Sequence, residues 1–243
     1  MDDRHAFVLM SGGFDSTVVA LFYFVHGYRI HPVKISYDSR QIEPENKALS
    51  KIIDLFKFES ITSIDVNLIN TSTLSKNSSP DMVEEGDYKD FTSVSTVVPG
   101  RNLAFIAALS NVAEAFALSN NIESVIAALG IHKSDWAMYP DCRSSFFYMA
   151  KNTVRAGTDG RVILTAPAID LEKKDIPKLL FHKINNHILD KDKIEYFLSL
   201  TYSCYRGGDI HCGTCPTCKE RHDAFISYFG KDSTIYLHNP DGE

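Results

Sequence analysis

The sequence predicts an α/β fold: a parallel sheet with helices on both faces, followed by a helical C-terminal region that carries a four-cysteine metal site. Three observations predict it. Short apolar runs alternate with amphipathic segments between residues 6 and 164, a glycine turn joins the first run to the first amphipathic segment, and four of the five cysteines lie within residues 204–218. Alternating strands and helices are typical of parallel sheets, because each crossover places a helix on one face.

Each strand is expected where a short apolar or β-branched run is bounded by polar residues or glycine. These runs are 6–10, 29–37, 61–66, 123–129 and 161–164. Each helix is expected where apolar residues recur three or four positions apart. The helical segments are 15–26, 43–58, 102–120, 141–155, 173–182, 191–200 and 219–229.

Two stretches show no regular pattern. Residues 67–96 are polar and aperiodic, and so long a loop is typical of a lid, a binding loop or a disordered segment. Residues 230–243 contain glycine, proline and aspartate, so we expect a loosely held tail. We divide the chain into an α/β domain, residues 1–170, and a C-terminal helical and metal-binding region, residues 171–243.

Composition excludes several classes of protein. A net charge of −6 argues against broad binding to DNA or RNA, which requires a basic face. No apolar run reaches the ~20 residues that span a bilayer, and the opening Met-Asp-Asp-Arg does not resemble a signal peptide. These features predict a cytoplasmic protein with no membrane partner.

The turn at residues 11–16, Ser-Gly-Gly-Phe-Asp-Ser, is the first candidate site. Glycine allows a positive φ and close approach of an anion, and the first N–H groups of the next helix point at the same place. The pattern lacks the Gly-Lys-Ser/Thr of a Walker A loop and the third glycine of a dinucleotide fingerprint. The alternative is a turn that only joins strand to helix. Candidate phosphate-binding residues are Met10, Ser11, Gly12, Gly13, Asp15, Ser16 and Thr17.

Three loops are expected to meet at one edge of the sheet. They are the glycine turn, residues 37–41 and residues 130–141, each of which follows a predicted strand. Ligands of open α/β sheets bind at the carboxyl ends of the strands. The sequence therefore predicts one site walled by these three loops.

The spacing Cys204-x7-Cys212-x2-Cys215-x2-Cys218 predicts a metal centre. Clustered cysteines in a cytosolic chain are more often metal ligands than disulfides. Four thiolates complete the tetrahedral shell of zinc and leave no open position, so we expect a structural Zn²⁺ site. An iron–sulfur cluster uses the same ligands, and spacing leaves that alternative open. A set of free thiols is the third interpretation.

Further motifs complete a pattern. They are Val-Pro-Gly-Arg-Asn at 98–102, Tyr-Pro-Asp-Cys-Arg at 139–143, Cys-Tyr-x-Gly-Gly at 204–208 and Cys-Gly-x-Cys-Pro-x-Cys at 212–218. In this order, and together with the glycine turn, they resemble the 7-cyano-7-deazaguanine synthases. These are PP-loop ATP pyrophosphatases with a Rossmann-like fold, in the adenine-nucleotide α-hydrolase-like (HUP) superfamily. The resemblance runs from about residue 7 to residue 229.

The resemblance implies an ATP-dependent carbon–nitrogen ligase. Such an enzyme uses ATP with Mg²⁺ to adenylate 7-carboxy-7-deazaguanine and converts the acid with ammonia to 7-cyano-7-deazaguanine (preQ0), an intermediate of queuosine biosynthesis. It also implies a homodimer and binding of ATP by the first domain.

The resemblance also implies roles for individual residues. The catalytic candidates are Asp15, Ser16, Arg101 and Lys173, and the nucleotide-binding set gains Gly100 and Arg101. The deazapurine-binding candidates are Tyr37, Arg40, Asp135, Tyr139, Asp141 and Arg143. Simpler interpretations remain: a surface arginine at 101, a helix N-cap at 141 and a solvated lysine at 173. Cys142 has no neighbouring base in the sequence, so we interpret it as a wall of the pocket.

Two loops depart from the family pattern. Residues 37–41 are Tyr-Asp-Ser-Arg-Gln where the family has Tyr-Gly-Gln-Arg-His, and residues 131–138 match the family only at Asp135. A divergent relative, such as one encoded with an anti-phage system, would attach a deazapurine-like acid to an amine on a protein or nucleic acid. A third hypothesis is a non-catalytic nucleotide-binding module. Acid-dependent ATP–pyrophosphate exchange separates the module from the ligases.

Overall fold

The computed structural model describes residues 4–86, 95–180 and 190–242. Its centre is a five-stranded sheet in the order β3-β2-β1-β4-β5, with every neighbouring pair parallel. The strands are β1 (His5–Leu9), β2 (Arg29–Ser36), β3 (Thr62–Asp65), β4 (Val125–Ala128) and β5 (Val162–Thr165). This confirms the predicted parallel α/β fold and the position of each strand.

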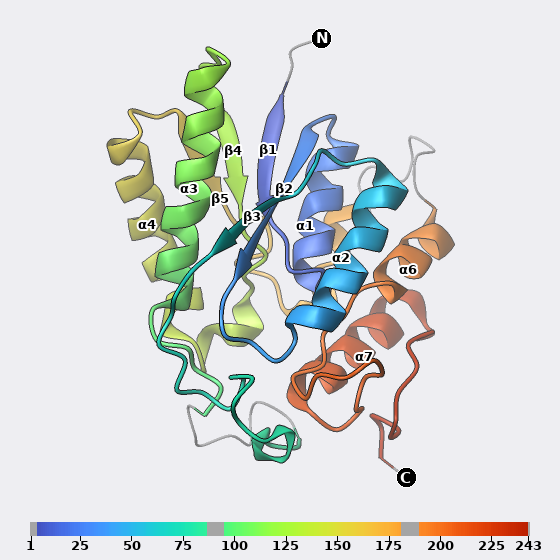
Figure 1. Ribbon diagram of the computed structural model, residues 1–243. Coiled ribbons are helices and arrows are strands. Elements are labelled where there is room, and N and C mark those ends of the chain that lie inside the picture. Colours follow the sequence, from blue (N-terminus) through green and yellow to red (C-terminus); the bar gives the residue numbers. More distant parts are fainter. Residues whose placement is uncertain (1–3, 87–94, 181–189, 243) are drawn as a thin grey trace.

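Helices cover both faces of the sheet (Figure 1). Those of the first part are α1 (Phe14–Val25), α2 (Ile42–Phe56), α3 (Arg101–Ser119) and α4 (Ser144–Gly157). One buried apolar cluster joins β1 to α1 and α2, and a second joins the sheet to α3 and α4 on the other side. The helices predicted at 15–26, 43–58, 102–120 and 141–155 therefore all pack their buried apolar residues toward the sheet.

The C-terminal region packs against α1. It contains α6 (Lys191–Ser199) and α7 (Pro216–Phe229), and Figure 1 shows both beside α1 and α2. Phe225 of α7 packs on Phe14 of α1, with ring centroids 5.5 Å apart. Ile194 and Leu198 of α6 belong to the same buried cluster as α1. The region thus covers the start of the helix that follows the glycine turn.

Three helix boundaries differ from the prediction. α7 begins at Pro216, where the ring presets the backbone for the first helical position. α4 begins at Ser144 after a short 3-10 turn, Pro140–Cys142. Of the helix predicted at 173–182, residues Lys173–Asp175 form a 3-10 turn, and positions 181–182 lie outside the described residues.

By length and composition, α3 is apolar enough to cross a membrane. In the structure it lies across the sheet, where it contacts β1, β4 and β5. Its side chains Ile106, Leu109 and Ala113 are buried in the second apolar cluster. A core helix passes the same test of length and composition, and this packing indicates that α3 is one.

Candidate functional site

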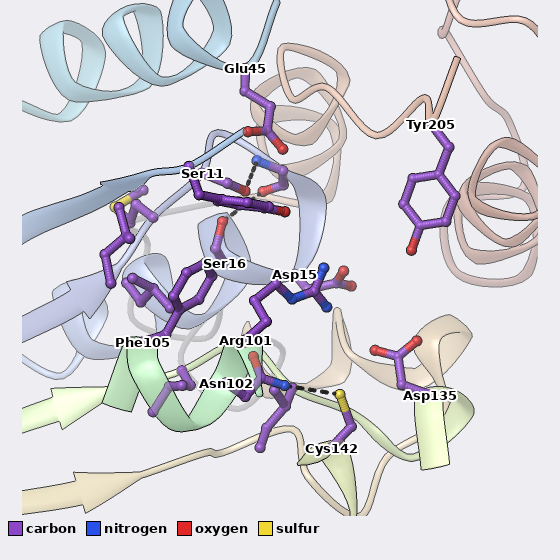
Figure 2. Close-up of a pocket in the computed structure, with 18 residues that line it drawn as sticks. Ser11, Asp15, Ser16, Glu45, Arg101, Asn102, Phe105, Asp135, Cys142 and Tyr205 are labelled. Atoms are coloured by element: carbon purple, nitrogen blue, oxygen red, sulfur yellow. Dashed lines mark hydrogen bonds between the residues drawn. The ribbon is translucent and has the colours of Figure 1, made fainter. Parts of the chain in front are cut away.

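A cavity of about 230 Å³ opens at the carboxyl ends of β1, β2 and β4. β1 lies between β2 and β4, so the strand order reverses at this point, as it does at the ligand sites of other open sheets. The three predicted loops meet here, because Ser11, Tyr37 and Gly130 all line the cavity. Figure 2 shows the labelled wall residues converging on this space.

The glycine turn is held between α2 and the C-terminal region. Gly12 has a φ of 92°, and a Cβ there would run into the backbone of Glu45 and Leu49 in α2. The backbone N–H of Tyr202 donates to the carbonyl of Gly12 at 3.0 Å. The absent side chain of Gly12 therefore makes room for a helix, whereas the sequence suggested room for an anion.

The start of α1 has the geometry of an anion site. Gly13 is the N-cap, and its carbonyl accepts from the hydroxyls of Ser16 at 3.2 Å and Thr17 at 2.8 Å. The hydroxyl of Ser11 accepts from the N–H of Gly13 at 3.1 Å. The first N–H groups of α1 have no partner within the helix and carry the positive end of its dipole. Ser11, Gly13 and Ser16 line the cavity at this point.

Asp15 lies in a cluster of charged groups beside the turn. Its Oδ2 is 3.3 Å from Nζ of Lys173 and 3.7 Å from Nε2 of His132. Nε2 of His132 is also 3.5 Å from Asp135, and Nζ of Lys173 is 3.7 Å from Glu220 of α7. Lys173 is buried, so the interpretation as a solvated lysine is wrong.

The cluster fixes the charge of its members. Burial would raise the pKa of Asp15, but the positive charges of Lys173 and His132 hold it well below its usual value. Burial would lower the pKa of His132, but the carboxylates of Asp135 and Asp15 raise it to about 9. At neutral pH the site therefore contains an ionised Asp15 and a protonated His132.

A smaller hollow of about 130 Å³ adjoins the main cavity. The charged cluster forms part of its wall, including His132, Lys173 and Glu220. The two spaces share the wall residues Ser11, Gly13, Asp15, Glu45, Asp135 and Tyr205.

The other walls of the main cavity are basic and aromatic. Arg101 reaches into the space from the first turn of α3 (Figure 2), and its guanidinium lies 5.6 Å from the ring centre of Tyr139. Tyr37 packs against Phe105 with ring centroids 5.5 Å apart. Cys142 is buried and lines the cavity, as its interpretation as a wall residue predicts, and burial raises the pKa of its thiol.

Several predicted residues lie outside the cavity wall. Arg40 donates to the carbonyls of Ser75 and Ser78 and so holds the loop after β3. The hydroxyl of Tyr139 contacts Thr96 at 2.7 Å, which places this buried side chain behind Arg101.

Asp141 and Arg143 also have structural partners. Oδ2 of Asp141 accepts from the N–H of Asn102 at 3.0 Å, so it caps α3 and not α4. Arg143 is exposed and donates to the carbonyl of Trp136 at 2.9 Å. Gly12, Thr17 and Gly100 support the turn or the start of α3 without lining the cavity.

The structure adds wall residues that the sequence did not predict as site residues. Among them are Glu45 in α2, Phe105 in α3, Glu220 in α7, and His132 and Tyr205 in loops. Each lies within or beside a quoted motif, but the motifs gave no reason to select it. Glu45 differs from the others, because it is one of two acidic residues that follow residues 37–41, the loop that departs from the family pattern.

The four predicted ligand cysteines form a compact buried cluster. The Sγ atoms of Cys204, Cys212, Cys215 and Cys218 all lie within 4.8 Å of one another. Tetrahedral coordination with metal–sulfur bonds of about 2.3 Å places sulfurs about 3.8 Å apart. The Sγ atoms of Cys212 and Cys218 are 3.8 Å apart.

Backbone donors complete the metal site. The N–H of Cys212 donates to Sγ of Cys204 at 3.4 Å, and the N–H of Cys215 donates to Sγ of Cys212 at 3.3 Å. Such bonds stabilise thiolates and orient them. The donor set therefore fits a closed four-coordinate metal ion.

Comparison with known proteins decides the family. The profile of the queuosine biosynthesis protein QueC family matches residues 5–229. The chain belongs to this family. The match spans the glycine turn, the residues that line both cavities and the cysteine cluster.

Curated relatives of the QueC family support the same assignment. A protein from Methanobrevibacter smithii is 32% identical and aligns over 97% of this chain and 99% of its own length. One from Caldicellulosiruptor saccharolyticus is 33% identical over 95% of both chains. One from Oceanobacillus iheyensis is 30% identical over 98% of this chain and all of its own length. Each is named 7-cyano-7-deazaguanine synthase, so the chain belongs to a family of enzymes.

Proposed function

We propose that this protein is an ATP-dependent carbon–nitrogen ligase that converts 7-carboxy-7-deazaguanine and ammonia to 7-cyano-7-deazaguanine. Membership of the QueC family and the names of its relatives support the substrate class. The observation that carries the ATP-dependent chemistry is the start of α1. Its unpaired N–H groups open into the same cavity as Arg101, so a phosphate donor and an acceptor acid meet in one space.

The chemistry explains why such a cavity is needed. A carboxylate is a poor electrophile, so its oxygen attacks the α-phosphorus of ATP and releases pyrophosphate. Ammonia then displaces AMP and gives an amide. A second adenylation, on the amide oxygen, allows AMP to leave together with a proton, and the nitrile forms. Each activation develops negative charge on phosphate oxygens, which fixed donors and cations stabilise.

Residues that line the cavity can fill each role in this reaction. Ser11, Gly13 and Ser16 would hold the phosphates at the mouth of α1, and the ionised carboxylate of Asp15 would be a ligand for Mg²⁺. Arg101 offers a planar fork for a phosphate or for the substrate carboxylate.

We further propose that the metal of the four-cysteine site is Zn²⁺ with a structural role, because a closed shell of four thiolates leaves no position for a substrate. The homodimer and the cytoplasmic location expected from the sequence stay predictions.

ATP–pyrophosphate exchange tests the proposal. The wild-type protein should exchange label only when 7-carboxy-7-deazaguanine is present, and mass spectrometry should find the free nitrile after addition of ammonia. Asp15→Asn should remove exchange, whereas the exposed Asp54→Asn in α2 should not. Wild-type protein that shows no acid-dependent exchange would contradict the proposal.

A further inference from the structure

The smaller hollow is suited to a ligand that is much smaller than a nucleotide. It has a volume of about 130 Å³, and one water-sized molecule needs roughly 10–15 Å³ of the same measure. It shares six wall residues with the main cavity, so a molecule held in the hollow lies next to the glycine turn. A nucleophile of the size of water fits there beside an acid bound in the main cavity.

The wall of the hollow favours a small cation. Four carboxylates line it, from Asp15, Glu45, Asp135 and Glu220, against the two cations of Lys173 and His132. Among the described residues, Oδ1 of Asp15 is buried without a hydrogen-bond partner. Nδ1 of His132 also has no partner in the described part of the chain, but on the protonated ring it is a donor and not an acceptor. A buried acceptor without a partner, such as Oδ1 of Asp15, is costly unless a ligand or water donates to it.

Ammonia has the matching chemistry. In neutral water it is carried mainly as ammonium, a cation with four N–H donors and no lone pair. An ammonium ion can satisfy carboxylate acceptors, but it cannot attack a carbonyl carbon until it loses a proton. The reaction proposed above therefore needs a proton acceptor at the border between the hollow and the cavity.

Glu45 is the carboxylate that best meets this need. It descends from α2 toward the turn at Ser11 (Figure 2), and it lines both spaces. The backbone packing of α2 on Gly12 fixes this position. Asp15 is a weak proton acceptor, because Lys173 holds it ionised at 3.3 Å. Asp135 also lines both spaces, but it lies 3.5 Å from Nε2 of His132, whereas Glu45, 3.6 Å from Lys34, keeps a raised pKa because burial outweighs that charge.

We propose that the smaller hollow binds ammonium and that Glu45 is the base that takes its proton. This inference rests on the proposed function. One proton passes from ammonium to the carboxylate of Glu45, and the freed nitrogen lone pair attacks the carbonyl carbon of the acyl adenylate. The C–N bond forms, the C–O bond to AMP breaks, and AMP leaves with that electron pair. The adduct loses its second proton to solvent.

The surroundings of Glu45 tune it for this step. Burial raises the pKa of Glu45 to about 7, against the opposing charges of Lys34 at 3.6 Å and of Arg101. A base works best when its pKa is close to the working pH, because it then accepts and releases a proton readily.

The test separates the two half-reactions. Glu45→Gln should keep acid-dependent ATP–pyrophosphate exchange within about twofold of wild type, because adenylation precedes the entry of ammonia. Its ammonium-dependent amide formation should fall about 100-fold or more, the usual effect of losing a general base. Hydroxylamine, which is neutral at pH 7 and needs no deprotonation, should trap the acyl adenylate equally fast in both proteins. Glu43→Gln, an exposed carboxylate of the same helix, is the control.

A second variant keeps the test decisive. Glu45→Asp retains the carboxylate and should recover part of the ammonium-dependent rate, while the urea midpoint of each variant reports folding. Unchanged amide formation in folded Glu45→Gln would overturn the inference. Loss of exchange in that folded variant would also overturn it, because Glu45 would then serve ATP or its metal. Absence of exchange in the wild type would instead refute the proposed function on which the inference depends.

Discussion

The ammonium group of Lys173 lies 3.3 Å from the carboxylate of Asp15. This ion pair joins the segment after β5 to the first turn of α1. Glu220 of α7 approaches the same ammonium group at 3.7 Å. These contacts link the glycine turn and the segment after β5 to α7, whose N-cap is the clustered cysteine Cys215. The C-terminal region therefore forms one wall of the site and contributes to its charge.

Lys173→Met should weaken both folding and the first half-reaction. Loss of one partner from a buried ion pair leaves the other charge uncompensated, and we expect the free energy of unfolding to fall by about 3 kcal/mol. Urea denaturation measures this change, and pyrophosphate exchange should fall with it. Lys174→Met removes an exposed neighbour and is the matched control. Equal midpoints for the two variants would show that Lys173 contributes nothing to the fold.

The contacts of His132 with Asp135 and Asp15 predict a loss of stability in alkaline solution. The folded state raises the pKa of His132 from 6.5 to about 9, which corresponds to about 3 kcal/mol in favour of the protonated ring. A group with a raised pKa stabilises the fold fully below its unfolded pKa. That stability is then lost as the pH rises through the folded value. The wild type should therefore lose stability between pH 6.5 and about 9.

Urea unfolding at several pH values checks this dependence. In His132→Gln the free energy of unfolding should change less over the same range, because no proton is released there. His238→Gln, at an exposed position of the tail, should keep the wild-type dependence. Parallel curves for the wild type and His132→Gln would contradict the prediction.

The packing of α2 on the glycine turn predicts a difference between two glycines. Gly12 and Gly100 both have positive φ, 92° and 65°, so alanine is strained at each. A Cβ at Gly100 meets nothing within 4 Å in the described part of the chain, whereas one at Gly12 meets the backbone of Glu45 and Leu49. We expect Gly12→Ala to cost about 1–3 kcal/mol more than Gly100→Ala, since packed backbone must shift. Denaturation midpoints that agree within error would argue against this packing.

Local signals were enough to predict the sheet and the turn. The strand runs, the glycine turn and the cysteine spacing depend on neighbouring residues, and each lies where the sequence placed it. Ligands of open α/β sheets bind at the carboxyl ends of the strands, and this rule predicted that the loops containing Ser11, Tyr37 and Asp135 meet. All three residues line one cavity. These predictions needed no knowledge of side-chain packing.

Packing over long sequence distances could not be predicted. Arg40 was expected in the pocket, but its guanidinium is taken by carbonyls of the loop at 75–78, which has no periodic pattern. His132 and Glu220 are far apart in sequence and meet only because α7 packs beside the turn at Lys173. Glu45 reaches the site because α2 rests on Gly12, a contact that periodicity does not encode.

The role of Gly12 shows the same limit at one position. The sequence indicated correctly that this position needs glycine, and its positive φ confirms the backbone argument. The sequence could not show that α2 fills the space beside it. A glycine pattern therefore predicts the turn better than it predicts the neighbour that the turn accommodates.

Cys215→Ser should remove the bound metal and loosen α7. Cys215 is the N-cap of α7 and one of the four clustered ligands, so the loss of metal releases the end of the helix that carries Glu220. Structural zinc contributes roughly 10–16 kcal/mol in small sites, so we expect a large loss of soluble protein and of pyrophosphate exchange together. Elemental analysis should find close to one Zn²⁺ per wild-type chain, and the absence of a visible absorption band should exclude an iron–sulfur cluster. Cys142→Ser, outside the cluster, should keep its metal. A soluble, metal-free Cys215→Ser protein with wild-type exchange would show that the metal is not needed to hold α7 against the active site.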